Sequence, residues 1–171
     1  KALGVDNKYI HTTIKQRLGS QEELRVVIGG PPCQAYSLAG RANNMNDERY
    51  NAKDDVRHFL YKEYLDILCL VRPQVFVMEN VKGILSSSID GEKLFPRIIQ
   101  DLQNPSKAIK NKNGENYKIY SLVQTAIDPL NPHYDDTSDF IIRSEEYGIP
   151  QSRHRVILLG VREDIKKIPS V

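Results

Sequence analysis

The amino-acid sequence predicts an α/β fold built around one central sheet. Three short apolar runs, at residues 24–28, 75–78 and 156–161, have the length and the β-branched composition of buried strands. Apolar residues at helical spacing fill the intervals between these runs. Apolar strands that alternate with amphipathic helices are typical of a sheet covered on both faces, so we expect a mostly parallel sheet in a single domain over residues 1–171.

The elements of the first half follow from periodicity and from glycine or proline stops. Residues 9–18 have helical spacing and end at Gly19, and the buried strand at 24–28 runs into a turn fixed by Gly29-Gly30-Pro31-Pro32. Residues 40–55 are polar and lack an apolar period, which predicts a long loop of the kind that often serves as a functional lid. A helix from Phe59 to Val71 then leads to the strand at 75–78.

The second half is expected to contain one helix and two strands. The helix covers residues 94–102, and a polar connector follows at 104–116. Residues 117–127 alternate well enough for a third strand, whereas 128–139 resemble an irregular insertion. The run at 156–161 is the last strand.

Composition excludes several classes of protein. Two cysteines cannot build a disulfide framework or a multi-cysteine zinc site, and the four histidines are scattered, so we expect no structural metal. No run of apolar residues is long enough for a membrane-spanning helix, so we expect no membrane partner. A net charge of +2 does not by itself indicate nucleic-acid binding.

Three polar motifs lie at the ends of the predicted strands, where ligands gather in α/β sheets. Cys33, on the stiff turn after the first strand, is placed as a nucleophile would be, although a small buried thiol is the alternative. Cys69 lies on the apolar side of a predicted helix, and this position favours a buried, unreactive thiol. Glu79 directly follows a buried strand, so its carboxyl group is expected either to be paired or to be protonated and able to donate a proton. A surface glutamate that caps the next turn is the alternative.

The third motif enters the last strand. Gln151, Arg153 and Arg155 would point the same way in an extended chain and could bind phosphates or carbonyl oxygens. A solvated strand end is the alternative interpretation.

Taken together, the segments GGPPCQAYS, PQVFVMENVKG and EYGIPQSRHRVILLG resemble, in sequence and in order, the C5-cytosine DNA methyltransferase family. The resemblance spans residues 24–161. It implies a Rossmann-like sheet, S-adenosylmethionine as cofactor, and double-stranded DNA with a flipped target cytosine as partner. It also suggests a bacterial restriction–modification system acting in the cytoplasm at the nucleoid.

The resemblance assigns roles residue by residue. Cys33 would add to C6 of cytosine, Glu79 would bind N3 and the exocyclic amine, and Arg155 would reach O2. Arg153 and Gln151 would support the pocket and a catalytic loop at 38–56. The remaining assignments are cofactor contacts by Pro32 and Leu60 and DNA contacts by Ser37 and Arg41 on the loop and by Asn80 and Gln151. Asn80 would also hold the loop that bears Cys33.

The sequence departs from the family pattern in three places. No F-x-G-x-G cofactor loop precedes Cys33, the recognition region is absent after 156–161, and the insertion at 128–139 is longer than the compact pattern. We therefore interpret residues 1–171 as a partial catalytic domain, and we expect this segment by itself to be inactive and to bind the cofactor weakly.

Three alternatives stay open. The family also has a branch that methylates tRNA with the same motifs, although AYSLAGRA after Gln34 favours DNA. A non-catalytic α/β scaffold could retain the motifs passively. A cysteine hydrolase would need a histidine base, for which His154 is the nearest candidate, but its flanking arginines disfavour the charged form.

Overall fold

The computed structural model describes residues 1–19, 23–31, 61–89, 91–111 and 113–170. Within these ranges one sheet contains β1 (Val26–Gly29), β2 (Val75–Val81), β5 (Tyr117–Tyr120), β6 (Ile141–Arg143) and β7 (His154–Arg162), and β3 (Ser88–Ile89) pairs with β4 (Glu92–Lys93). The helices in the described ranges are α1 (Asn7–Arg17), α3 (Tyr61–Val71), α4 (Leu94–Gln103) and α5 (Pro105–Ala108). The same ranges contain the 3₁₀ turns η2 (Lys82–Ser86), η3 (Thr137–Phe140) and η4 (Ser144–Tyr147). None of the helices in these ranges is long and apolar enough to cross a membrane.

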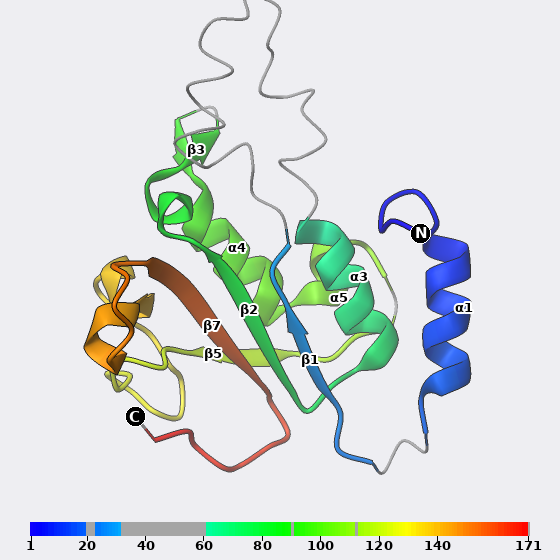
Figure 1. The fold of residues 1–171 in the computed structure, drawn as a ribbon. Helices are drawn as coiled ribbons and strands as arrows, with labels where there is room; N and C mark the ends of the chain where they lie inside the picture. The colour runs from blue at the N-terminus through cyan, green and yellow to red at the C-terminus, as the bar shows by residue number, and fades with distance from the viewer. Residues whose placement is uncertain (20–22, 32–60, 90, 112, 171) are drawn as a thin grey trace, which may run out of the picture.

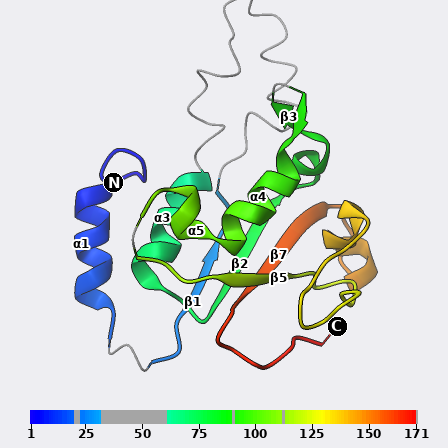
Figure 2. The ribbon, with the colours of Figure 1, turned by 180° about the vertical axis from the view of Figure 1, so that it is seen from behind.

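The predicted α/β class is confirmed. Helices α3, α4 and α5 lie over one face of the central sheet (Figures 1 and 2), and α1 packs beside α3. The helices predicted at 9–18 and 94–102 correspond to α1 and α4, and the described part of the helix predicted from Phe59 corresponds to α3. The strand predicted at 156–161 lies inside β7.

The expectation of mostly parallel pairing was wrong for the described strands. The strand order is β1-β2-β7-β5, and only β1 and β2 pair in parallel, whereas β7 runs antiparallel to β2, β5 and β6. Strand β7 follows β6 through residues 144–153, and this connection is shorter than the dozen or more residues that a parallel crossover needs. The hairpin therefore reverses β7, while β1, β2 and β5 share one direction.

The core lies between the sheet and the helices. Phe76 and Met78 of β2 and Leu158 of β7 are almost fully buried against apolar residues of α3 and α4. Gly160 of β7 faces Phe76, and a Cβ added at Gly160 would lie 2.1 Å from the Phe76 ring. The close approach of the ring thus requires glycine at this position.

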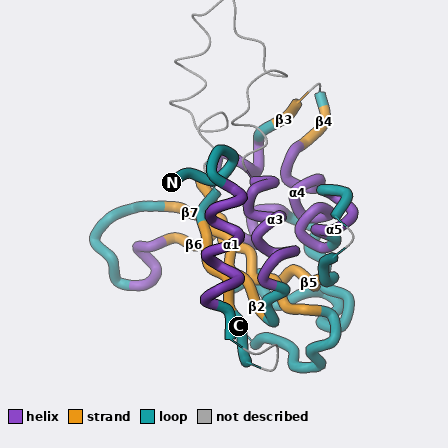
Figure 3. The backbone as a smooth tube through the Cα atoms, turned by 90° about the vertical axis from the view of Figure 1, so that its right-hand side faces the viewer, coloured by secondary structure: helices purple, strands orange, loops and turns teal. Residues whose placement is uncertain are grey.

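The opposite face of the sheet is more open. Seen edge-on, α3, α4 and α5 lie to one side of the strands (Figure 3). Side chains of β2 and β7 on the other face are half-buried, and Val26 and Ile28 of β1 are 51% and 77% exposed. The prediction of a buried strand at 24–28 was therefore wrong for the described part of the chain, in which β1 is an edge strand.

Two further differences concern residues 104–127. The predicted connector contains α5, which begins with Pro105 at a position where proline favours helix initiation. The predicted strand at 117–127 ends at Tyr120, because the Ser121 hydroxyl accepts hydrogen bonds from the backbone N–H groups of Val123 and Gln124. Such local bonds form a turn and compete with strand pairing. Residues 128–136 are irregular, and their description as an insertion stays a prediction.

Candidate active site

The sequence placed Glu79 and Asn80 after the strand, but in the structure both residues lie inside β2. Strand β2 continues to Val81 because residues 79–81 pair with residues 155–157 of β7. Side chains alternate along a strand, so Glu79 points to the open face of the sheet and Asn80 to the side covered by helices. The two neighbouring polar residues therefore act in different surroundings.

Glu79 forms an ion pair with Arg155. The Arg155 Nε atom lies 2.8 Å from Glu79 Oε1, and the Arg155 and Glu79 side chains are 24% and 44% exposed. They sit diagonally across the ladder, since Glu79 is opposite Ile157 and Arg155 is opposite Val81. Of the alternatives left by the sequence, Glu79 is paired in this structure. An ion pair this exposed stabilises the fold by about 1 kcal/mol or less, so its main consequence is geometric.

The same carboxylate lies against the end of β1. A Cβ added at Gly30 would stand 3.0 Å from Glu79 Oε2, a contact that leaves no space for a larger residue unless the carboxylate moves. Gly30 precedes Cys33 by three residues. The glycine thus allows the carboxylate to approach the chain that leads into the proline–cysteine motif.

Asn80 is 5% exposed and connects β2 to that chain from the other side. Its Nδ2 donates to the Pro31 carbonyl over 3.4 Å, and its Oδ1 accepts from the Val81 N–H over 2.9 Å. Both ends of the buried amide are therefore hydrogen-bonded, and one of them holds the backbone two residues before Cys33.

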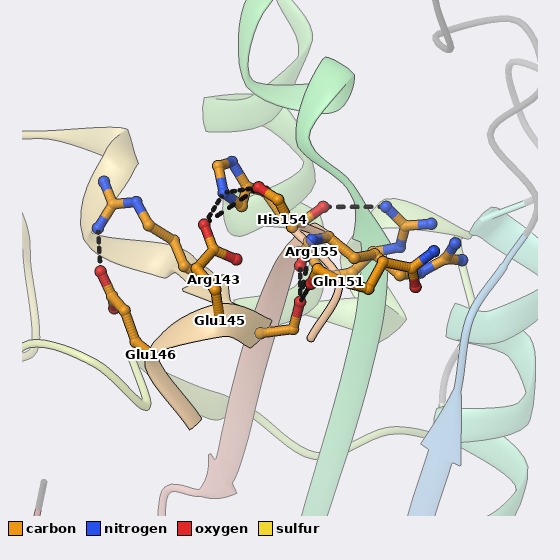
Figure 4. Close-up of polar contacts among 9 residues, drawn as sticks. Arg143, Glu145, Glu146, Gln151, His154 and Arg155 are labelled. Carbon is orange, nitrogen blue, oxygen red and sulfur yellow. Dashed lines mark hydrogen bonds and ion pairs between the residues drawn. The ribbon is translucent and has the colours of Figure 1, made fainter. Parts of the chain in front are cut away.

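Gln151 and Arg153 precede β7, which begins at His154. Both side chains are exposed, and Gln151 lies in a bend rather than in the extended strand that we expected. Residues 144–153 connect β6 to β7. In Figure 4 the side chains of Gln151 and Arg155 extend to one side of this connection, and those of Glu145 and Glu146 lie on the other. The structure thus brings Arg155 and Glu79 into contact and places Gln151 and Arg153 on the segment that enters the same strand.

Several predicted site residues lie outside the described residues. They are the nucleophile and its neighbouring proline, the two proposed loop contacts and the predicted cofactor contact, with the loop itself: Cys33, Pro32, Ser37, Arg41, Leu60 and residues 38–56. Their roles stay predictions, as does a separation of Cys33 and Glu79 of less than about 10 Å.

A cavity of about 420 Å³ lies between the end of β1, α3 and the N-terminal segment. Its walls include Leu3, Ile28, Gly30, Glu63 and Tyr64. The Tyr64 hydroxyl donates to the Val77 carbonyl over 3.0 Å, which fixes its ring, and burial raises the pKa of this phenol. Sequence reasoning missed Glu63 and Tyr64, although they follow Leu60 by the three and four positions that share a helix face.

Cys69 is buried, as its position on the helix predicted. It is 3% exposed, and burial, with a smaller contribution from Asp66, raises the pKa of its thiol to about 11. Since the thiolate is the reactive form, we expect iodoacetamide at about pH 7.5 to leave Cys69 unmodified in the folded protein and to label it after unfolding in urea. Peptide mass mapping measures both; rapid labelling of Cys69 without urea would contradict this assignment.

In the same described part of the chain, no group of three or more His, Cys, Asp or Glu side chains gathers closely enough to hold a metal ion. The polar groups where β1, β2 and β7 meet at one end of the sheet are instead the carboxylate of Glu79, the amide of Asn80 and the guanidinium of Arg155.

The fold defines a class of protein. A solved E. coli structure described as a putative DNA modification methyltransferase encoded within a prophage superposes on 99% of this chain and 35% of its own, with a TM-score of 0.55 and 23% identity. The chain therefore shares the Rossmann-like fold of that structure. The sequence model of the family C-5 cytosine-specific DNA methylase matches residues 6–170, so the chain belongs to this family.

Curated relatives agree with this family. The type II methyltransferase M.BspRI of Lysinibacillus sphaericus is 29% identical over 157 residues, which cover 92% of this chain and 28% of the relative. M.AquIA of Picosynechococcus, also a type II methyltransferase, is 34% identical over 82% of this chain and 44% of its own length. The DNA (cytosine-5-)-methyltransferase M.ApeKI of Aeropyrum pernix is 31% identical over 82% and 27%. The chain thus spans between about a quarter and under half of these relatives.

Proposed function

We propose that this protein contributes the catalytic centre of a DNA cytosine-C5 methyltransferase of the restriction–modification type. The observation that carries the proposal is the Glu79–Arg155 pair, with its 2.8 Å contact, beside the backbone that leads into Cys33. Cys33 follows Pro31 by two residues, which span at most about 7 Å between Cα atoms. The proposal therefore puts the Cys33 thiol near the Glu79 carboxylate and the Arg155 guanidinium, at one end of the sheet.

In the proposed reaction, the Cys33 thiolate bonds to C6 of a cytosine that has left the base stack. A proton held between Glu79 and N3 stabilises the negative charge that enters the ring, and Arg155 binds O2. S-adenosylmethionine, when bound, supplies an electrophilic methyl group for C5. The C5 proton then leaves to a proton acceptor such as water, its electron pair forms the C5=C6 double bond, and the C6–S bond breaks to release the Cys33 thiolate. Before the target cytosine enters the site, the ion pair holds Glu79 and Arg155 in position.

The cavity at the end of β1 is suited to part of the cofactor. Its volume of about 420 Å³ lies within the usual range for small-molecule pockets. Apolar walls at Leu3 and Ile28 suit an adenine ring, and Glu63 offers a carboxylate to hydroxyl or amino groups. We assign Pro32 and Leu60 to the same pocket on the strength of the family motifs.

Duplex DNA is the proposed substrate because relatives are named as type II and DNA (cytosine-5-)-methyltransferases. Ser37, Arg41 and Gln151 would then contact the DNA, and Arg153 would support the pocket around the flipped base. Hydroxyl, amide and guanidinium groups are common partners of phosphate oxygens and base edges. The recognition sequence depends on segments beyond these motifs.

A methyl-transfer assay tests the substrate. The natural full-length protein is incubated with tritiated S-adenosylmethionine and either unmethylated genomic DNA or bulk tRNA, and the modified base is identified by mass spectrometry. We expect 5-methylcytosine in DNA and background counts in tRNA. Exclusive labelling of tRNA would reassign the substrate, and no labelling of either would count against catalysis.

A further inference from the structure

The turn between β6 and β7 carries the third motif, and its backbone is fastened at one residue. Residues 144–153 form this turn, in which Gly148 has a φ of 77° and allows the chain to reverse after η4. Gln151 and Arg153 lie near its end, two to four residues before Arg155. The directions in which these side chains leave the backbone therefore depend on how the turn is held.

Ser144, at the start of the turn, is bound to its far end. The Ser144 Oγ accepts a hydrogen bond from the Arg153 N–H over 2.9 Å. The same hydroxyl can donate to the carbonyl oxygen of Gln151 at 2.5 Å or of Arg153 at 3.0 Å. The backbone N–H of Ser144 also donates to the Arg153 carbonyl over 3.3 Å. One hydroxyl thus contacts three backbone atoms of the segment that carries the motif.

A second contact across the turn is weaker. Glu145 Oε1 lies 2.7 Å from His154 Nε2 and accepts from the Ser152 hydroxyl over 3.2 Å (Figure 4). The hydrogen bond from His154 lowers the pKa of Glu145, but both side chains are substantially exposed. Exposed ion pairs contribute little, so the hydroxyl of Ser144 is the main fastening of residues 151–153.

We propose that Ser144 is a positioning residue that orients Gln151 and Arg153 and fixes the path of the chain into Arg155. This inference rests on the proposed methyltransferase function, in which these side chains surround the flipped base. Arg155 is also bound to Glu79, so a shift of the turn is transmitted to the ion pair. Small misplacements of catalytic groups are costly, and about 1 Å can lower a rate by about 100-fold.

The test compares Ser144→Ala with Ser144→Thr in the natural full-length protein, and Ser152→Ala serves as the matched control. Ser152 carries a hydroxyl in the same turn, but its hydroxyl contacts Glu145 and His154 rather than the backbone of 151–153. For Ser144→Ala we expect kcat to fall by about 10- to 100-fold, with an unchanged KM for S-adenosylmethionine, because the cofactor pocket lies at β1. Ser144→Thr should restore most of kcat, and Ser152→Ala should retain it.

Amide hydrogen exchange separates this inference from the proposed function. Without substrate, Ser144→Ala should speed exchange of the Arg153 amide about tenfold or more, because its acceptor is lost, while core amides of β2 remain protected. Wild-type exchange at Arg153, or an equal loss of kcat in Ser152→Ala, would overturn the role of Ser144. A wild-type protein that transfers no methyl group would count against the proposed function alone, because exchange still tests the fastening.

Discussion

In the natural full-length protein, replacement of Cys33 by serine is expected to abolish methyl transfer and to leave folding and DNA affinity largely intact. A hydroxyl is far less ionised than a thiol near neutral pH, so the substituted serine would be a poor nucleophile toward C6 of cytosine. The measurement is the tritiated-methyl assay on DNA, together with thermal unfolding and a DNA-binding titration of the same variant. We expect background counts with an unfolding midpoint and an affinity near those of the wild type.

A duplex that contains 5-fluorocytosine identifies the nucleophile directly. Fluorine cannot leave C5 as a proton does, so the covalent adduct between Cys33 and the base should persist through denaturation. Cys69→Ser is the matched control, because Cys69 is a buried thiol and should play no part in trapping. An adduct mapped to Cys69, or full activity in Cys33→Ser, would contradict the mechanism.

Periodic patterns in the sequence predicted much of the fold. The helical spacing at 9–18 and at 94–102 produced α1 and α4 within two residues at each end. The continuous apolar run at 156–161 correctly located β7. These predictions succeeded because amphipathic spacing and helix-stopping residues act locally, within a turn or two of the chain.

The errors concern properties that depend on distant partners. The apolar run of β7 predicts a buried strand but not its direction in the sheet. The short connection from β6 makes β7 antiparallel to its neighbours. The residues of β1 have a buried-strand composition, yet they lie at the edge of the described sheet. Likewise Glu79 and Asn80 belong to β2 because β7 supplies pairing partners for them, which a charged residue after an apolar run does not reveal.

The candidate site shows the same division. The motifs identified Glu79 and Arg155 separately, but their contact follows from the register that pairs Val81 with Arg155. Ser144 and Glu63 were missed, since a serine or a glutamate on its own carries no signal. Ser144 acts across the turn at residues 144–153, and Glu63 lines a cavity formed by three segments.

Glu79→Gln should lower the rate of methyl transfer by about 10²- to 10⁴-fold, the usual range for loss of an acid–base group. Glutamine keeps the shape of the side chain and can still contact Arg155, but it cannot hold a proton at N3 of the cytosine. Because Glu79 is 44% exposed, the change should alter the free energy of unfolding by only about 1 kcal/mol or less. Single-turnover kinetics at saturating DNA and cofactor measure the chemical step.

Two further variants separate the chemistry of Glu79 from its ion pair. Glu146→Gln is the matched control, because Glu146 pairs with Arg143 on the far side of the same turn and should retain the wild-type rate (Figure 4). Arg155→Gln removes the partner of Glu79 and the proposed contact to O2 but leaves the carboxylate in place. If Glu79 acts on the base, combining Glu79→Gln with Arg155→Gln should slow transfer further than Arg155→Gln alone. A Glu79→Gln variant that transfers methyl groups within about threefold of the wild type, a difference of only about 0.7 kcal/mol in the barrier, would restrict Glu79 to positioning Arg155.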